Sequence, residues 1–340
     1  MINNLGGIGR YLGVAVQRHA SGLDSNDLLK ILRQARLNKF GKVLDPINEA
    51  NALKNPEVLD GKRLNSLSEY IHTYKLKSGD FVAAATDIGF GRSRNEDRVA
   101  VHPSGNGVIV VDGLGLGGGG IVAQVVAEVF CRRNGIVDDY FTKECLKDIL
   151  EKEVNGDVGA WDAACFASCK IEEDGGKKIA KINIVGDCKV LIFGKNGFKF
   201  ESDEQSLVYE MVSDGRLTPD EALYHPDRNV VYNSIKSSGV NDPLSYEREV
   251  EEGGIIFVVS DGISDNLTPD EIWKLIKDHM DNPKKVIEIL SDVTDDRMKN
   301  CSRLTRMMSY EARASAGVYP DGFSSKPKKD NIGVGVIRVN

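Results

Sequence analysis

Residues 107–113 have the sequence GVIVVDG, and residues 255–262 have the sequence IIFVVSDG. Each stretch is an unbroken apolar run that ends in an aspartate and a glycine. Runs without polar alternation are typical of strands covered on both faces, here by a second sheet and by helices. Four more runs share this pattern: FVAAATD (81–87), KINIVGD (181–187), KVLIFG (189–194) and NIGVGVIRVN (331–340). These runs predict buried sheets from about residue 80 onward.

Helices are predicted between the strands. The sequence IVAQVVAEVFCRR (121–133) follows a glycine-rich loop, and residues 141–153 form the next expected helix. Thr-Pro-Asp-Glu occurs at 218–221 and again at 268–271. It places Thr at the N-cap, Pro at the first helical position and Glu three residues after the cap. Asn282-Pro283 starts a further helix, and the basic stretch 297–329 is expected to end in a loop.

The first 79 residues differ in character from the rest. A run of apolar residues with helical spacing, LLKILRQARLNKF (28–40), follows the acceptors Ser25, Asn26 and Asp27. A second helix is expected at 67–74, after a polar stretch. We therefore divide the chain into a helical N-terminal extension, residues 1–79, that packs on a main domain, residues 80–340.

Composition narrows the class of protein. The 340 residues carry a net charge of −7, which argues against nucleic-acid partners and against attraction to anionic membranes. No run is long enough to span a membrane, and the N-terminus lacks the apolar core of a signal peptide. The six cysteines are scattered without zinc-type pairing, which is typical of free thiols in a reducing compartment. We expect a cytoplasmic protein; the oligomeric state is not indicated.

Acidic residues stand at the ends of the predicted strands. Asp112, Asp187 and Asp261 each follow an apolar run, whereas Asp330 precedes one. Because the end of one strand lies beside the start of its antiparallel neighbour, all four can meet at one edge of a sheet. Asp97 ends the turn-rich loop GFGRSRNED (89–97), which can carry it to the same edge.

Carboxylates gathered without histidine or cysteine are suited to hard divalent cations. The negative charges of neighbouring carboxylates repel one another unless cations neutralise them. Ligand sets made only of oxygen favour Mg²⁺ or Mn²⁺ over Zn²⁺. Two such ions can share a water, lower its pKa and present it as hydroxide for attack on phosphorus. The Gly113 carbonyl can add a ligand where a side chain would crowd the ion. Arg92, five residues before Asp97, can grip a phosphate through paired hydrogen bonds.

Other interpretations compete for the separate motifs. A lone Asp-Gly after a strand is usually a turn, and only the ordered set is specific. The glycine loop 115–120 fits a dinucleotide fingerprint, and Asp138 and Asp139 roughly meet its demand for an acidic residue about twenty positions on. That fold needs alternating strands and helices, which the clustered strands do not provide. A P-loop is disfavoured because the loop lacks its lysine.

The ordered motifs resemble the protein phosphatase 2C family, the PPM metallophosphatases, of the compact bacterial type. The resemblance covers residues 80–340 and is carried by TDIGFGRSRNED (86–97), VVDGLG (110–115), GDC (186–188), SDGISD (260–265) and DN (330–331), with a segment like the family's flap at 206–231. It implies an α+β fold: a four-layer α/β/β/α sandwich of two antiparallel sheets flanked by helices, with metals in a cleft at one end.

The resemblance also implies the roles of the site residues. Two Mn²⁺ or Mg²⁺ ions would be held by Asp97, Asp112, Gly113, Asp261 and Asp330, and a third, more weakly bound ion by Asp187, Asp261 and Asp265. Arg92 would bind the phosphate, and Glu96 would support the water that attacks it. The implied reaction is hydrolysis of phosphoserine and phosphothreonine in protein substrates by a metal-bridging hydroxide, without a phosphoenzyme.

This sequence departs from the family pattern at several positions. Leu114 stands where animal members carry a histidine proposed as general acid, a residue that bacterial members also lack. Gln205 replaces a histidine, Cys188 replaces a serine, and residues 163–165 read AAC instead of Gly-Thr-Thr. A rival hypothesis is a catalytically inactive protein of the same fold that acts as a regulator or scaffold. Loss of a metal-binding aspartate would be its signature, and every expected aspartate is present.

Overall fold

The computed structural model describes residues 57–60, 71–222, 225, 227–240, 242–316 and 328–340; the side chains of residues 57, 58, 60, 220 and 300–316 are not described. All the described residues fall within the compact unit Ile47–Asn340. The predicted helix at 28–40 lies outside the described residues, as do the first residues of the one predicted at 67–74.

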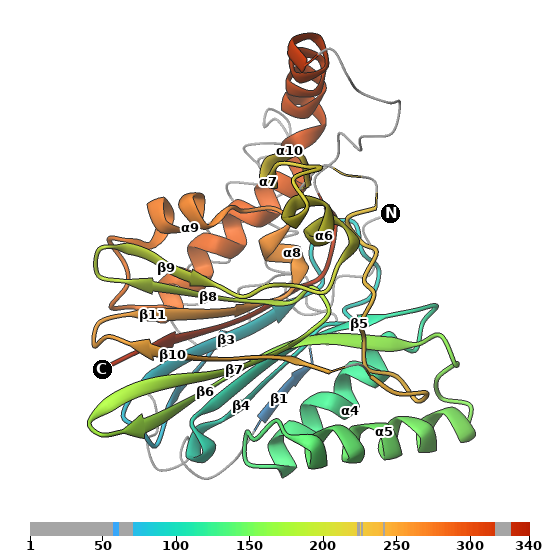
Figure 1. Ribbon diagram of the computed structural model, residues 1–340, viewed down its shortest axis with the longest axis vertical. Helices are drawn as coiled ribbons and strands as arrows, with labels where there is room; N and C mark the ends of the chain where they lie inside the picture. The colour runs from blue at the N-terminus through green and yellow to red at the C-terminus, as the bar shows by residue number, and fades with distance from the viewer. Residues whose placement is uncertain (1–56, 61–70, 223–224, 226, 241, 317–327) are drawn as a thin grey trace, which may run out of the picture. The chain divides into compact units, whose positions relative to one another are not determined.

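Two six-stranded antiparallel sheets form the centre of this unit (Figure 1). The first has the order β1 (Glu57–Asp60), β4 (Arg98–His102), β5 (Gly107–Leu114), β6 (Ala163–Asp174), β7 (Lys177–Val185) and β10 (Leu244–Val250). The second has the order β2 (His72–Lys75), β3 (Phe81–Asp87), β12 (Ile332–Arg338), β11 (Ile255–Val259), β8 (Lys189–Gly194) and β9 (Gly197–Glu201). All six apolar runs singled out in the sequence are strands.

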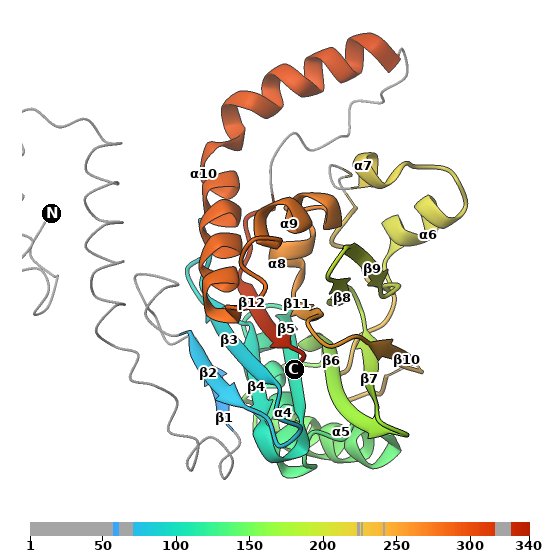
Figure 2. The same cartoon turned by 90° about the vertical axis from the view of Figure 1, so that its left-hand side faces the viewer.

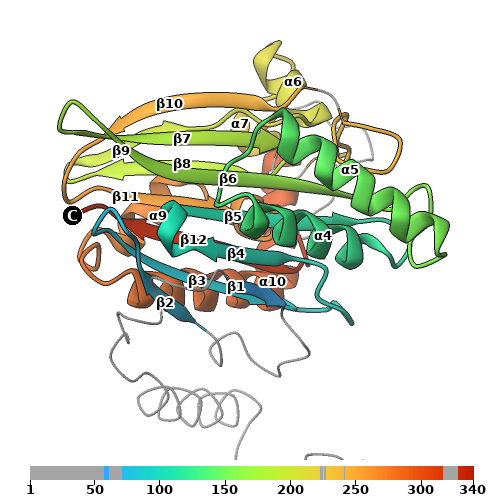
Figure 3. The same cartoon turned by 90° about the horizontal axis from the view of Figure 1, so that it is seen from below.

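Helices cover the outer faces of both sheets. Helices α4 (Gly119–Arg132) and α5 (Asp139–Val154) pack on the first sheet, across β4, β5 and β6 (Figure 3). Helices α8 (Asp261–Ser264) and α9 (Pro269–Ile276) lie on the second sheet, together with the first part of α10 (Pro283–Ala316), whose buried residues run to Met298. The short helices α6 (Leu207–Ser213) and α7 (Pro219–Ala222) follow β9 in the chain and lie outside the layered sandwich (Figure 2). A 3-10 turn, η2, spans Pro103–Gly105. The predicted four-layer α+β sandwich is confirmed.

Three apolar clusters hold the layers together. One fills the space between the sheets, with Val108, Val110 and Val258 among its fully buried members. The other two lie under the helices on each side. Strands that face two of these clusters have no polar face, which explains the unbroken apolar runs.

The predicted boundary at residue 79 differs from the structure. Strand β1 pairs with β4, and β2 pairs with β3, so residues 57–60 and 72–75 are edge strands of the two sheets. The helix expected at 67–74 is replaced at its end by β2, where Ile71 and Tyr74 are buried against the sandwich. Packing against the sheet outweighs the helical spacing of these residues.

None of the helices in the described part of the chain combines the length and the apolar character needed to cross a bilayer. Five cysteines are free thiols, as predicted, and four of them are buried. The sixth, Cys301, lies where side chains are not described.

Candidate metal and phosphate site

Three aspartates from different strand ends converge, as their sequence positions predict. Asp112 lies near the end of β5, Asp187 in the turn after β7, and Asp261 at the first residue of α8 after β11. Each offers a carboxylate oxygen, and these three oxygens lie within 4.8 Å of one another. All three residues are buried. Within the described part of the chain, Oδ1 of Asp187 and Oδ1 of Asp261 have no hydrogen-bond partner.

Asp97 reaches the same place from the loop after β3. Its Oδ2 accepts a hydrogen bond of 2.7 Å from Ser260 Oγ, and Ser260 Oγ accepts one of 2.8 Å from the Gly333 backbone N–H. Ser260 is fully buried between β11 and β12. A serine hydroxyl thus ties the loop aspartate to the ends of two strands of the second sheet.

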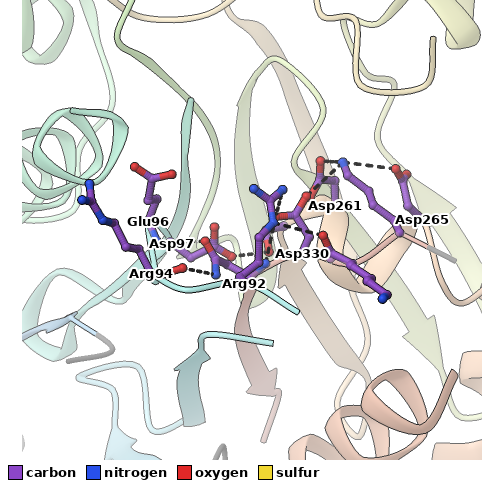
Figure 4. A network of polar contacts seen from close by, with 12 residues as sticks. Arg92, Arg94, Glu96, Asp97, Asp261, Asp265 and Asp330 are labelled. Atoms are coloured by element: carbon purple, nitrogen blue, oxygen red, sulfur yellow. Dashed lines mark hydrogen bonds and ion pairs between the residues drawn. The ribbon is translucent and has the colours of Figure 1, made fainter. Parts of the chain in front are cut away.

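Asp330 lies among the acidic residues and forms ion pairs with two basic side chains. Its Oδ1 lies 2.6 Å from an Nη of Arg92, and its Oδ2 lies 3.6 Å from Lys328 Nζ. Figure 4 shows Glu96 and Asp97 on one side of Asp330, and Asp261 and Asp265 on the other. The Arg92 side chain is 44% exposed, whereas that of Asp330 is 9% exposed. The guanidinium therefore lies at the open side of a buried acidic site.

Asn331 holds the loop that carries these residues. Its Nδ2 donates to the carbonyls of Ile88 (2.8 Å) and Arg94 (2.7 Å), and its Oδ1 accepts from the Glu96 N–H (2.9 Å). The loop 88–96 is therefore fixed at both ends by one amide group. An asparagine directly after Asp330 therefore holds the loop that carries Arg92 in place.

The glycine loop is shaped by close packing. A Cβ atom on Gly113 would lie 2.4 Å from the Gly119 carbonyl carbon and 2.8 Å from the Glu96 carbonyl oxygen. Asp162, which is buried, accepts hydrogen bonds from the backbone N–H groups of Leu116 and Gly159. β5 is antiparallel to both of its neighbours, so the loop does not belong to a βαβ unit. The dinucleotide-binding alternative is therefore excluded.

Burial raises the pKa values of the site carboxyls. Loss of solvation, helped by the charge of Asp330, raises the pKa of Asp97 from 3.8 to about 7. Burial, with the charges of Asp97 and Asp330, raises the pKa of Asp112 well above its usual value. Burial also raises the pKa of Asp187, although Lys328 opposes the shift. Carboxyls this crowded favour either protons or added cations.

The departures from the family pattern have structural explanations. Gln205 Oε1 accepts hydrogen bonds from the Gly186 N–H (3.1 Å) and Asn233 Nδ2 (2.7 Å), so it ties the segment before α6 to the turn that carries Asp187. Cys165 and Cys188 are buried beside this turn. A Cβ atom on Gly186 would lie 2.0 Å from Cys165 Sγ, so these substitutions affect packing behind the carboxylates.

The structure brings the predicted aspartates into one site. Asp187, expected only at a third position, groups with Asp112 and Asp261. Asp261 and Asp265 also face the ammonium of Lys328, and Asp330 lies closest to Arg92. Sequence analysis assigned no role to Lys328 or Asp162, and it used Ser260 only as the first residue of the motif SDGISD. Lys328 carried a visible signal as part of the basic run KPKK (326–329) directly before Asp330.

No protein-family model matches the chain. Over 205 residues it is 25% identical to a putative protein phosphatase 2C-type protein of Streptococcus pyogenes, a match that covers 57% of this chain and 83% of the relative. It is also 25% identical over 208 residues to the serine/threonine protein phosphatase PstP of Mycobacterium tuberculosis, where it spans only 38% of the relative's length.

Solved structures share the fold. The Mycobacterium tuberculosis serine/threonine phosphatase PstP/Ppp superposes with a TM-score of 0.57 at 18% identity, covering 76% of this chain and 98% of that one. The PstP catalytic domain in complex with two manganese ions superposes with a TM-score of 0.56 at 17% identity, covering 76% and 98%. Motifs, fold and sequence matches agree: the chain is similar to bacterial PPM-type, or protein phosphatase 2C-type, serine/threonine phosphatases.

Proposed function

We propose that this protein is a metal-dependent protein phosphatase that hydrolyses phosphoserine and phosphothreonine in protein substrates. The observation that carries the proposal is the convergence of buried carboxylates with unpaired oxygens on Asp187 and Asp261, beside the exposed guanidinium of Arg92. Buried polar atoms without a partner are costly, and a bound cation would remove that cost. The donor set contains only oxygen, which suits Mn²⁺ or Mg²⁺.

The residues around the site would hold two ions. We assign Asp112, Asp261 and Asp330, with Asp97 and the Gly113 carbonyl, to the binuclear centre, and we place Asp187 directly beside it. Asp265 lies outside this two-ion set. The ions, when bound, would lower the pKa of water and offset the charge that develops on the phosphate.

The chain's own residues would position the substrate. Arg92 donates from Nε to the Lys329 carbonyl at 3.0 Å and contacts Asp330 at 2.6 Å, which fixes its guanidinium at the open side of the site. A phosphate there can take paired hydrogen bonds from the guanidinium. Glu96, whose backbone is held by Asn331, would orient water. Leu114 cannot donate a proton, so another group would protonate the leaving oxygen.

Hydrolysis of p-nitrophenyl phosphate and of a phosphothreonine peptide with added Mn²⁺ tests the proposal. We expect activity that disappears on chelation and is lost in Asp261→Asn. Activity that survives chelation, or that is undiminished in Asp261→Asn, would overturn the metal-dependent mechanism. Inactivity of folded, manganese-loaded protein would favour the scaffold instead.

We also place the protein in the cytoplasm. The free thiols of the described cysteines support a reducing compartment. Thiol labelling of the denatured, unreduced protein taken directly from cells should modify all six cysteines. Labelling of fewer cysteines would contradict this location.

A further inference from the structure

Lys328 places its ammonium group inside the acidic site. Its Nζ contacts Asp261 Oδ2 and lies 3.3 Å from Asp265 Oδ2 and 3.6 Å from Asp330 Oδ2. The Lys328 side chain is only 6% exposed. A lysine enclosed by three carboxylates from two segments of the chain differs from an ordinary surface ion pair.

The backbone around Lys328 is anchored. The buried side chain of Asn266 donates from Nδ2 to the Lys328 carbonyl at 3.0 Å and to the Gly262 carbonyl at 2.9 Å. One amide therefore links the segment before β12 to α8, which begins at Asp261 and has Asp265 as its C-cap. This link sets the distance between the lysine backbone and the two carboxylates that its ammonium meets.

A second basic side chain faces Asp265. Arg228, which is buried, places its Nε 4.0 Å from Asp265 Oδ2. Asp265 is thus bordered by Lys328 and Arg228. Its Oδ2, like Oδ1 of Asp187 and Oδ1 of Asp261, makes no hydrogen bond in the described part of the chain. The Lys328 ammonium therefore lies between Asp261 and Asp265, and Arg228 adds a second positive charge next to Asp265.

We propose that Lys328 is a built-in cation that takes the place of a third divalent ion between Asp261 and Asp265. The inference rests on the proposed metal-dependent function. A divalent ion and an ammonium a few ångströms apart repel each other strongly in a poorly solvated site, so they exclude one another there. Asp261 would then bind two cations. Its Oδ2 contacts Lys328, and its unpaired Oδ1 would be available to a divalent ion. The protein saturates with two divalent ions, and its third positive charge is supplied by the chain.

Counting bound Mn²⁺ tests this directly. Electron paramagnetic resonance of free Mn²⁺ during a titration gives the number of ions per chain and their affinities. Wild-type protein should bind about two ions, and Lys328→Met, which keeps the apolar stem and removes the charge, about three. The matched control is Lys329→Met, because Lys329 is exposed and its Nζ lies 5.0 Å from the centre of the Phe90 ring. It should bind about two.

A second variant leaves Lys328 in place. Asp265→Asn in the wild-type background should keep the count at about two, since no divalent ion uses that position. A fall in the count, or a Lys328→Met protein with the same count and affinities as wild type, overturns the inference. In that case Mn²⁺-dependent phosphopeptide hydrolysis by wild-type protein would show that the proposed function still stands. Absence of Mn²⁺ binding in wild type and in both lysine variants would overturn the inference and the proposed function together.

Discussion

The contacts of Asn331 allow an estimate of how much stability the protein would lose without its side chain. Its side chain makes three hydrogen bonds to the backbone of the loop 88–96, and it is buried. Each such bond contributes about 1 kcal/mol, and the groups left unpaired add to the cost. A single amide therefore stabilises the loop that carries Arg92 and Asp97.

Replacing Asn331 by alanine should lower the free energy of unfolding by about 2–4 kcal/mol. It should also raise KM for phosphopeptide, because Arg92 loses its support. Urea denaturation and steady-state kinetics measure the two effects. Asn155→Ala, at the exposed end of α5, is the control and should change stability by less than about 0.5 kcal/mol. Equal losses in both variants would contradict the role of Asn331.

Protons and cations should compete for the carboxyls. Burial raises the pKa of Asp97 from 3.8 to about 7. Between these values the folded, cation-free chain holds more protons than the unfolded chain, so the free energy of unfolding should fall as the pH rises. Binding of Mn²⁺ at about pH 6 should release protons, since cations need ionised carboxylates. Calorimetry in two buffers of different ionisation enthalpy measures this release. The same heat in both buffers would be the contrary result.

At the scale of elements, the tetrapeptide Thr-Pro-Asp-Glu allows an internal comparison. In α9, Thr268 and Glu271 form a capping box, and Arg297 of α10 contacts Glu271 at 2.7 Å. In α7, Thr218 Oγ1 accepts from the Glu221 N–H, but the helix is only four residues long and Thr218 is exposed. The same cap thus begins one helix with buried residues, Ile272 and Ile276, and one short surface turn.

Thr268→Ala should therefore cost about 1 kcal/mol of stability or more. Thr218→Ala should cost clearly less, because loss of a short exposed turn removes little packing. Thermal or urea unfolding of the two variants measures the difference. A larger loss for Thr218→Ala would contradict the assignment of α9 to the core of the second sheet.

Strands, caps and the gathering of aspartates are predictable because each follows from local spacing. Asp112, Asp187 and Asp261 stand at strand ends, and antiparallel pairing brings strand ends together. The position of Lys328 is not predictable in this way, because it depends on contacts with residues more than 60 positions earlier in the chain. The helix predicted at 67–74 is also wrong at its end. The residues there have helical spacing, but they form β2, which pairs with β3.

At the scale of the whole molecule, the two sheets approach closely beneath the site. A Cβ atom on Gly335 would lie 2.6 Å from Val108 Cγ2. A Cβ atom on Gly333 would lie 2.7 Å from Val110 Cγ1 and 3.1 Å from Asp97 Oδ2. These two glycines of β12 therefore let the second sheet approach β5, which carries Asp112.

Gly335→Ala and Gly333→Ala should each lower stability by about 1–3 kcal/mol, because the added methyl group forces the sheets apart. Only Gly333→Ala should also weaken Mn²⁺ binding, since it alone crowds Asp97. Urea unfolding and Mn²⁺ titration separate these effects. Equal weakening of Mn²⁺ binding in both variants would show that sheet separation, and not Asp97, governs the site.

The proposed function depends on cations that carboxylates at the strand ends would hold. Its most direct test is one Mn²⁺ titration in which phosphate release from a phosphothreonine peptide is followed together with bound Mn²⁺, for wild type and Asp112→Asn. We predict that the wild-type rate rises with occupancy and that Asp112→Asn lowers the saturated rate by about 100-fold or more, a loss of about 3 kcal/mol. A rate independent of bound Mn²⁺, or an Asp112→Asn protein as active as wild type, would contradict the claim.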